Sequence, residues 1–192
     1  ISGAFMECEG ITDVTLPDGL ITIGRSAFSG CINMTSINIP ESVTRIGGFA
    51  FNGCKSLTDI VIPDGVTVID EALFQSCEAL TSVTIPEGAT ELGNSAFCNC
   101  TSLTSLTIPD GVTEIGNNAF NRCIGLTSIT IPDSVTQIGS TAFYDCTELV
   151  DITWGNGLKS IGGSAFNGCS KLTSAVIPDS VETIEGYAFG NC

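Results

Sequence analysis

Apolar and polar positions follow one pattern along this chain, and the pattern returns every 23 residues. Its most regular members are a phenylalanine and, three residues later, a cysteine. A proline keeps the same period, with Gly155 in its one vacant position. No insertion or deletion interrupts the pattern, and a fixed period of this length predicts a solenoid of stacked coils. The two columns are Phe5, Phe28, Phe51, Phe74, Phe97, Phe120, Phe143, Phe166 and Phe189, and Cys8, Cys31, Cys54, Cys77, Cys100, Cys123, Cys146, Cys169 and Cys192.

Residues 55–77 illustrate the elements of one repeat. The stretch LTDIVI at 57–62 ends in an alternation of apolar and outward positions that predicts a short strand. The PDG at 63–65 predicts a turn that ends this strand, because proline presets φ and cannot donate to a ladder. The VTVI at 66–69 predicts a second brief extended segment. The ALFQSC at 72–77 has room for one helical or 3₁₀ turn.

A single coil buries too little apolar surface to stay folded alone, so coils must stack and complete their strand hydrogen bonds on one another. At about 4.8 Å per strand, eight coils make a rod about 40 Å long. We expect one array over residues 1–192. It divides into a partial repeat 1–8 and full repeats 9–31, 32–54, 55–77, 78–100, 101–123, 124–146, 147–169 and 170–192.

The amino-acid composition excludes several classes of partner and chemistry. Six Lys and Arg face 21 Asp and Glu, for a formal net charge of -15, so nucleic acid and anionic membranes are unfavourable partners. The chain has no histidine, the commonest general base and zinc ligand, and no phosphate-binding glycine loop. We therefore expect no enzymatic activity, no cofactor and no metal. No apolar run reaches the roughly 18 residues of a membrane span, no signal peptide is visible, and the start at Ile1 within a repeat indicates a trimmed fragment.

The pattern L-x-x-L-x-I-P-x-x-V-x-x-I-G-x-x-A-F-x-x-C resembles the BspA-like class of leucine-rich repeats, and residues 126–146 are its best match. The resemblance covers essentially the whole chain. It implies a leucine-rich-repeat solenoid: a right-handed, curved superhelix of about eight coils, with short parallel strands and one helical or 3₁₀ turn per coil. It also implies a surface or secreted protein of a host-associated bacterium or a protist, and it supplies no catalytic residues. The departures from the pattern are Leu73 at the alanine position, Asp70 and Glu185 at the glycine position, and residues 154–156 in place of I-P-D.

The cysteine column admits two interpretations. Stacked coils place neighbouring Cα atoms about 5 Å apart, which a disulfide can span, yet equivalent side chains point the same way, into the core. We expect buried, reduced thiols that donate weak hydrogen bonds to the backbone, and neither disulfides nor zinc sites. Cys98 stands outside the column, and we expect it to be the one exposed thiol.

A second column is acidic and follows the turn proline. It could be a row of weak calcium sites, or it could reflect the preference of such turns for aspartate. We favour the turn, because calcium sites gather several oxygens from one loop and each coil offers one carboxylate here. The column is Asp18, Glu41, Asp64, Glu87, Asp110, Asp133, Asn156 and Asp179.

The outward positions of the main strands read S-x-T or D-x-T in many coils. Short polar residues suit exposed strands without any function, but together they also form a hydroxyl-rich platform of the kind that solenoid binding proteins present. Ice-binding solenoids carry threonine in nearly every coil, and Asn38, Val61 and Val176 break that regularity here. The candidate ligand-binding residues are Ser82, Thr84, Ser105, Thr107, Ser128, Thr130, Asp151 and Thr153.

Aromatic residues are sparse outside the phenylalanine column. Phe49 and Tyr187 precede a core phenylalanine by two residues, and Tyr144 follows one directly. Exposed aromatics are common interface anchors, so these three join the candidate ligand-binding residues. Trp154 takes an inward isoleucine position, and we expect it to fill core volume.

These observations predict a non-catalytic binding or adhesion module of a surface or secreted protein. The expected partner is a protein or glycan, including a host extracellular protein. The alternative is a structural spacer in a larger cell-surface protein, with no specific ligand in this segment. We expect neither membrane insertion nor nucleic-acid binding, and we expect the ends of the array to abut further repeats or to self-associate.

Overall fold

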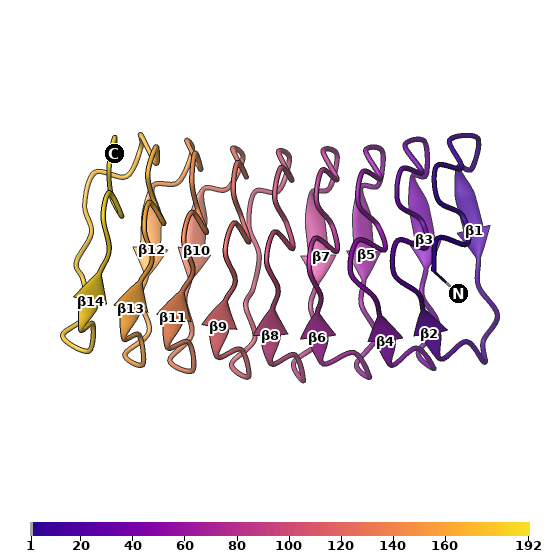
Figure 1. Cartoon of the computed structure of the whole chain (residues 1–192), viewed down its shortest axis with the longest axis horizontal. Helices are drawn as coiled ribbons and strands as arrows, with labels where there is room; N and C mark the ends of the chain where they lie inside the picture. Colours follow the sequence, from indigo (N-terminus) through magenta and orange to yellow (C-terminus); the bar gives the residue numbers. More distant parts are fainter. Residues whose placement is uncertain (1) are drawn as a thin grey trace.

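Successive coils lie side by side along one axis in the computed structural model, which describes residues 2–192 (Figure 1). The chain runs from one end of this axis to the other without doubling back. All strand pairs are parallel, and paired residues are 23 apart, as in Val14 with Ile37. The predicted solenoid of stacked repeats is therefore confirmed.

The first ladder consists of three-residue strands whose central side chain points inward. They are β1 (Asp13–Thr15), β3 (Ser36–Asn38), β5 (Asp59–Val61), β7 (Ser82–Thr84), β10 (Ser128–Thr130) and β12 (Asp151–Thr153). Hydrogen bonding joins them as three separate pairs, β1 with β3, β5 with β7, and β10 with β12. The equivalent residues 105–107 and 174–176 are extended in sequence pattern but are not paired as strands.

The second ladder consists of two-residue strands after the proline turn. They are β2 (Thr22–Ile23), β4 (Arg45–Ile46), β6 (Val68–Ile69), β8 (Glu91–Leu92), β9 (Glu114–Ile115), β11 (Gln137–Ile138), β13 (Ser160–Ile161) and β14 (Thr183–Ile184). The last six form one continuous sheet, and β2 pairs with β4. The second residue of each strand faces the core in all but β14, where Ile184 is half exposed.

The Ala-Phe-x-x-Cys segments form a third ladder of turns, and no helix or 3₁₀ turn occurs in the part of the chain that the structure describes. The amides alternate in their use. Those of Ser95, Phe97 and Asn99 donate to the next coil, at 2.8 Å each, while those between them close turns within the coil. A helix needs every one of these amides internally, so the inter-coil bonds replace the expected helical turn. Ser95 and Asn99 take the left-handed φ values of 58° and 60° that this alternation requires.

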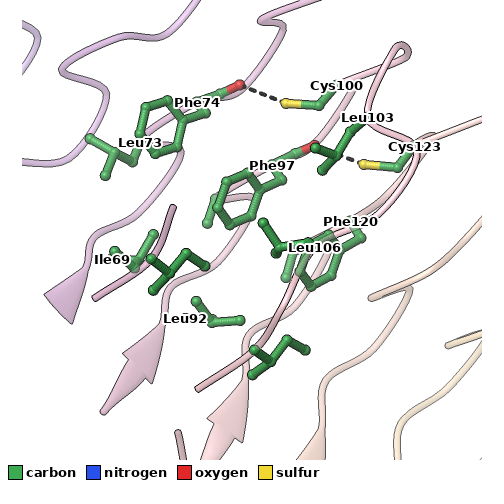
Figure 2. Packing of buried hydrophobic residues seen from close by; sticks show 14 of the residues in the cluster. Ile69, Leu73, Phe74, Leu92, Phe97, Cys100, Leu103, Leu106, Phe120 and Cys123 are labelled. Carbon is green, nitrogen blue, oxygen red and sulfur yellow. Dashed lines mark hydrogen bonds between the residues drawn. The ribbon is translucent and has the colours of Figure 1, made fainter. Parts of the chain in front are cut away.

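The core is a column of stacked phenylalanine rings, of which Figure 2 shows three. Neighbouring rings from Phe5 to Phe189 are 4.9–5.6 Å apart between centroids and lie within 18° of parallel. The rings between Phe28 and Phe166 are at most 1% exposed. Leu73 is fully buried in its alanine position, so that departure leaves the core intact.

Trp154 packs against this column from the side, as expected of a residue that fills core volume. Its ring meets Phe166 edge-on, at 5.5 Å and 73°. The vacant proline position beside it has a steric cause, since a Cβ at Gly155 would lie 2.3 Å from the carbonyl oxygen of Pro132. Only glycine fits where the two coils approach this closely.

Candidate functional site

The outward side chains of the first ladder form the hydroxyl face, which is the main candidate site. All eight predicted residues are exposed: Ser82, Thr84, Ser105, Thr107, Ser128, Thr130, Asp151 and Thr153. The register places Ser128 beside Asp151 and Thr130 beside Thr153. Ser105 and Thr107 belong to the unpaired segment, so the face is interrupted between β7 and β10 and is not one continuous sheet.

A further threonine column borders this face and was missed by the sequence reasoning. It lies one residue before most of the strands, with Val150 in its place before β12, and several of its hydroxyls donate to the carbonyl of the preceding coil, as Thr81 does to Thr58 at 3.0 Å. Thr35 and Thr127 make the same bond at 3.2 and 3.3 Å. The signal was present as a threonine every 23 residues. The oxygens of these hydroxyls can still accept hydrogen bonds, so the threonine column extends the polar surface of the hydroxyl face.

The hydroxyl face is hollowed at its N-terminal end, over β1, β3 and β5. The hollow has a volume of about 440 Å³, and its polar lining includes Asp13, Ser36, Asn38 and Asp59. The Ser36 hydroxyl lies 3.5 Å from an Asp13 carboxylate oxygen, and the Thr58 hydroxyl donates to Asp59 at 2.8 Å. The sequence reasoning placed its candidates only in later coils, because Asn38 and Val61 interrupt the S-x-T pattern here.

The three predicted aromatic anchors lie in the turn ladder, so the structure does not place them among the strands of the hydroxyl face. Tyr187 is 81% exposed. Tyr144 and Phe49 are both half-buried. The guanidinium of Arg25 lies over the Phe49 ring, 4.6 Å from its centroid, in a cation–π contact. Arg25 also forms an ion pair with Glu71 at 3.3 Å, so its side chain is held over the Phe49 ring and partly covers it.

The thiols of the cysteine column lie in the core and hydrogen-bond to backbone carbonyls, as the sequence predicts. From Cys31 onward, each thiol of the column donates to the carbonyl of the phenylalanine 26 residues earlier, in the preceding coil, as Cys100 does to Phe74 at 3.1 Å (Figure 2). Burial raises the pKa of the Cys54 and Cys169 thiols to about 12. The buried thiols between Cys31 and Cys169 are therefore protonated hydrogen-bond donors of low reactivity.

Alkylation of the native protein should modify the accessible thiols and leave the buried ones unmodified. We expect a neutral alkylating agent at mildly alkaline pH to modify Cys98, Cys8 and Cys192, because these three are half-buried or exposed. The expectation that Cys98 alone is accessible is thus wrong, since Cys8 and Cys192 lack a covering coil in this structure. Mass spectrometry of the intact protein should find seven thiols unmodified until denaturant is added. Modification of most thiols in the native state would contradict the buried column.

The acidic column is exposed, and one of its carboxylates hydrogen-bonds the turn of the next coil. An oxygen of Asp133 accepts the amide of Asn156 in the next coil at 2.7 Å. Within residues 2–192, no three acidic or thiol side chains gather closely enough to hold a metal ion. Nor does any helix of these residues have the length and apolar character to cross a membrane.

Comparison with known proteins identifies close structural relatives. A leucine-rich repeat protein of Bacteroides ovatus is 32% identical over 88% of this chain and 52% of its own, with a TM-score of 0.69. The T. pallidum leucine-rich repeat protein is 30% identical over 90% and 70%, with a TM-score of 0.60. A leucine-rich cell surface protein of Faecalibacterium prausnitzii is 30% identical over 98% and 66%, with a TM-score of 0.54. This chain thus spans about half the length of the first of these proteins.

The repeats themselves match a family model. Comparison with curated proteins finds no relative. The model described as BspA type leucine rich repeat region matches in six copies, over residues 2–123 and 90–192. Together these matches span the stacked coils, both strand ladders and the phenylalanine column. The chain therefore belongs to the BspA-type leucine-rich repeat family.

Proposed function

We propose that this chain is a binding or adhesion module that presents its hydroxyl face to a protein or glycan partner. Family membership suggests a protein-interaction or adhesion module, and the leucine-rich repeat solenoid is typically non-catalytic. The observation that supports the proposal most directly is the exposure of all eight polar side chains on one side of the first ladder. The relative from Faecalibacterium prausnitzii is a cell surface protein, which supports a surface or secreted location for this chain.

Short hydroxyl side chains suit recognition for an energetic reason. Serine and threonine have few rotamers, so fixing them against a partner costs little conformational entropy. Each hydroxyl can donate or accept, which adapts to protein main chain or to sugar hydroxyls. The face also carries Asp13, Asp59 and Asp151, and the chain has a net charge of -15. A neutral glycan or a basic protein surface is therefore the favoured partner, and an acidic one is disfavoured.

A spacer role is the second candidate. The observation in its favour is that the coils repeat in strict register, so that a coil can be added or removed without changing the chemistry of the interfaces. The apolar hollow at the first coil, lined by Phe5, Leu16 and Leu20, supports the proposal that array ends abut further repeats or self-associate.

Charge placed on the hydroxyl face should distinguish the two roles. We expect Thr107→Lys with Thr130→Lys to abolish capture of a partner from panels of immobilised extracellular proteins and glycans. The matched control is Thr113→Lys with Thr136→Lys, which places the same charges in the same two coils, one residue before strands β9 and β11 of the second ladder. This control should keep full capture. A spacer would instead tolerate both pairs of changes and the removal of residues 78–100, and loss of capture in the control would contradict the choice of face.

A further inference from the structure

One turn between the two strand ladders is built differently from the others. In seven coils the amide of the apolar residue after the turn donates to the carbonyl of the turn proline, as Val135 does to Pro132 at 3.1 Å. In residues 147–169 glycine replaces this proline, and the amide of Leu158 makes no bond to the carbonyl of Gly155. This turn is therefore the one, among the described coils, that its own backbone hydrogen bond does not close.

The turn without a closing bond contains an asparagine followed by a glycine, Asn156 and Gly157. Asn156 is exposed, and its backbone amide donates to an Asp133 carboxylate oxygen of the preceding coil at 2.7 Å. Its side chain makes no hydrogen bond within residues 2–192, and the amide of Gly157 donates to no carbonyl of these residues. The side-chain carboxamide and the amide nitrogen that follows it are therefore both free.

A free asparagine–glycine pair can react in water without an enzyme, an oxidant or a cofactor. The Gly157 amide nitrogen loses its proton to hydroxide and attacks Cγ of Asn156. The new N–Cγ bond closes a succinimide ring, and the Cγ–Nδ2 bond breaks with release of ammonia. Water then opens the ring: attack at Cγ gives aspartate in the original backbone, and attack at the backbone carbonyl carbon of residue 156 gives isoaspartate. Glycine favours the first step because it has no side chain to hinder the attack.

The chain contains two further asparagine–glycine pairs, which provide an internal comparison. Asn52 with Gly53 and Asn167 with Gly168 both lie in the turn ladder that ends each coil. The amides of Gly53 and Gly168 donate to carbonyls of the next coil at 2.7 and 2.8 Å. An amide held in this way cannot attack a neighbouring carboxamide until the junction between the two coils opens locally.

The side chains of these two asparagines are held as well. Nδ2 of Asn52 donates to the side-chain oxygen of Gln75 at 3.1 Å, and its Oδ1 accepts from the Ser29 hydroxyl at 3.4 Å. Oδ1 of Asn167 accepts from the Asn191 side chain at 3.0 Å. The same dipeptide thus occurs three times, and only in the turn without a closing bond are both reacting groups free.

We propose that Asn156 is a site of spontaneous deamidation in the folded protein, and that it converts to aspartate and isoaspartate while Asn52 and Asn167 persist. The site belongs to the acidic column, whose members in the neighbouring coils are Asp133 and Asp179. The aspartyl product places a carboxylate in the one position of this column that lacks it. It also adds one negative charge to a chain whose formal net charge is -15.

The isoaspartyl product has a different consequence, because its backbone is longer by one methylene group. A Cβ at Gly157 would overlap the carbonyl oxygen of Asp133, so the two coils already touch at this turn. An interior packed this closely has no room for the added atom. The isoaspartyl turn must therefore move residues 147–169 away from residues 124–146, and the isoaspartyl form should melt at a lower temperature than the aspartyl form.

The test follows deamidation over time at mildly alkaline pH, in the folded protein and in urea, by peptide mapping with mass spectrometry. In the folded protein we expect Asn156 to react at least about tenfold faster than Asn52 and Asn167, whose glycine amides are protected. In urea the three should react at similar rates, which separates the effect of the fold from that of the dipeptide. A rate at Asn156 in the folded protein no greater than at the other two would overturn the proposal.

Two variants locate the modification independently of the peptide map. Asn156→Gln must close a larger ring to react, so the acidic species that accumulates in the aged protein, measured by ion exchange, should be absent. The matched change Asn167→Gln should leave its accumulation unchanged. Asn156→Asp reproduces the aspartyl product and should melt above the isoaspartyl form isolated from aged protein. Acidic species that persist in Asn156→Gln would contradict the site, and equal melting temperatures would contradict the effect of the longer backbone.

Discussion

Replacement of Phe120 by alanine is expected to destabilise the protein by about 3–5 kcal/mol, the largest effect of any single change considered. Its ring is fully buried and stacks on Phe97 at 5.3 Å and on Phe143 at 5.1 Å. Truncation removes the transfer energy of the ring and leaves a cavity between two coils that cannot close, because the turn ladder fixes their spacing. Equilibrium unfolding in urea, followed by circular dichroism, measures the loss.

The control for this change is Val150→Ala, at a side chain that is 54% exposed. We expect it to alter stability by less than about 0.5 kcal/mol. Because each coil contacts only its neighbours, the Phe120→Ala variant should also unfold first around residues 101–146. Hydrogen exchange of the amides of Phe97 and Phe120 reports that local loss. A cost below about 1 kcal/mol would show that the ring column is not the main source of stability.

Gly116→Ala is expected to cost about 1–3 kcal/mol even though it adds one methyl group. The new Cβ would lie 2.7 Å from the Asn94 nitrogen, 2.7 Å from the Gly93 carbonyl carbon and 2.8 Å from the Leu92 oxygen. All three are backbone atoms of the neighbouring coil, so no side chain can move aside. The strands β8 and β9 must separate, and the melting temperature should fall.

Gly88→Ala provides the matched comparison in the neighbouring coil. There the nearest atom to a new Cβ is the Asp64 oxygen, at 3.8 Å, which is ordinary contact. Alanine narrows the unfolded ensemble, so this change should be neutral or stabilising by up to about 1 kcal/mol. Equal melting temperatures for the two variants would mean that close coil approach does not require glycine at position 116.

The repeat made most of the fold predictable. A period of 23 fixed which side chains stack, so the phenylalanine column, the buried thiols and the two strand positions followed from the spacing alone. The conformation of the turn segment could not be predicted from the spacing. The amides of Ser95, Phe97 and Asn99 donate to the next coil, and the sequence of a single repeat gives no sign of these bonds. Nor does the pattern of residues 105–107 distinguish this unpaired segment from the paired strand β10.

The candidate sites were predictable only in part. Exposure of the S-x-T positions followed from strand alternation, and the structure places all eight on one side. The hollow over β1, β3 and β5 was not predictable, because Asn38 and Val61 interrupt the S-x-T pattern in these coils.

The thiol-to-carbonyl bonds between coils have a consequence for how the chain must be produced. A folded array hides most of its sulfur and tolerates an oxidising medium without cross-links. An unfolded chain exposes ten cysteines whose thiolates can attack one another. Any wrong bridge would prevent a coil from closing, so refolding yield should depend strongly on keeping a reductant present until the rings have stacked.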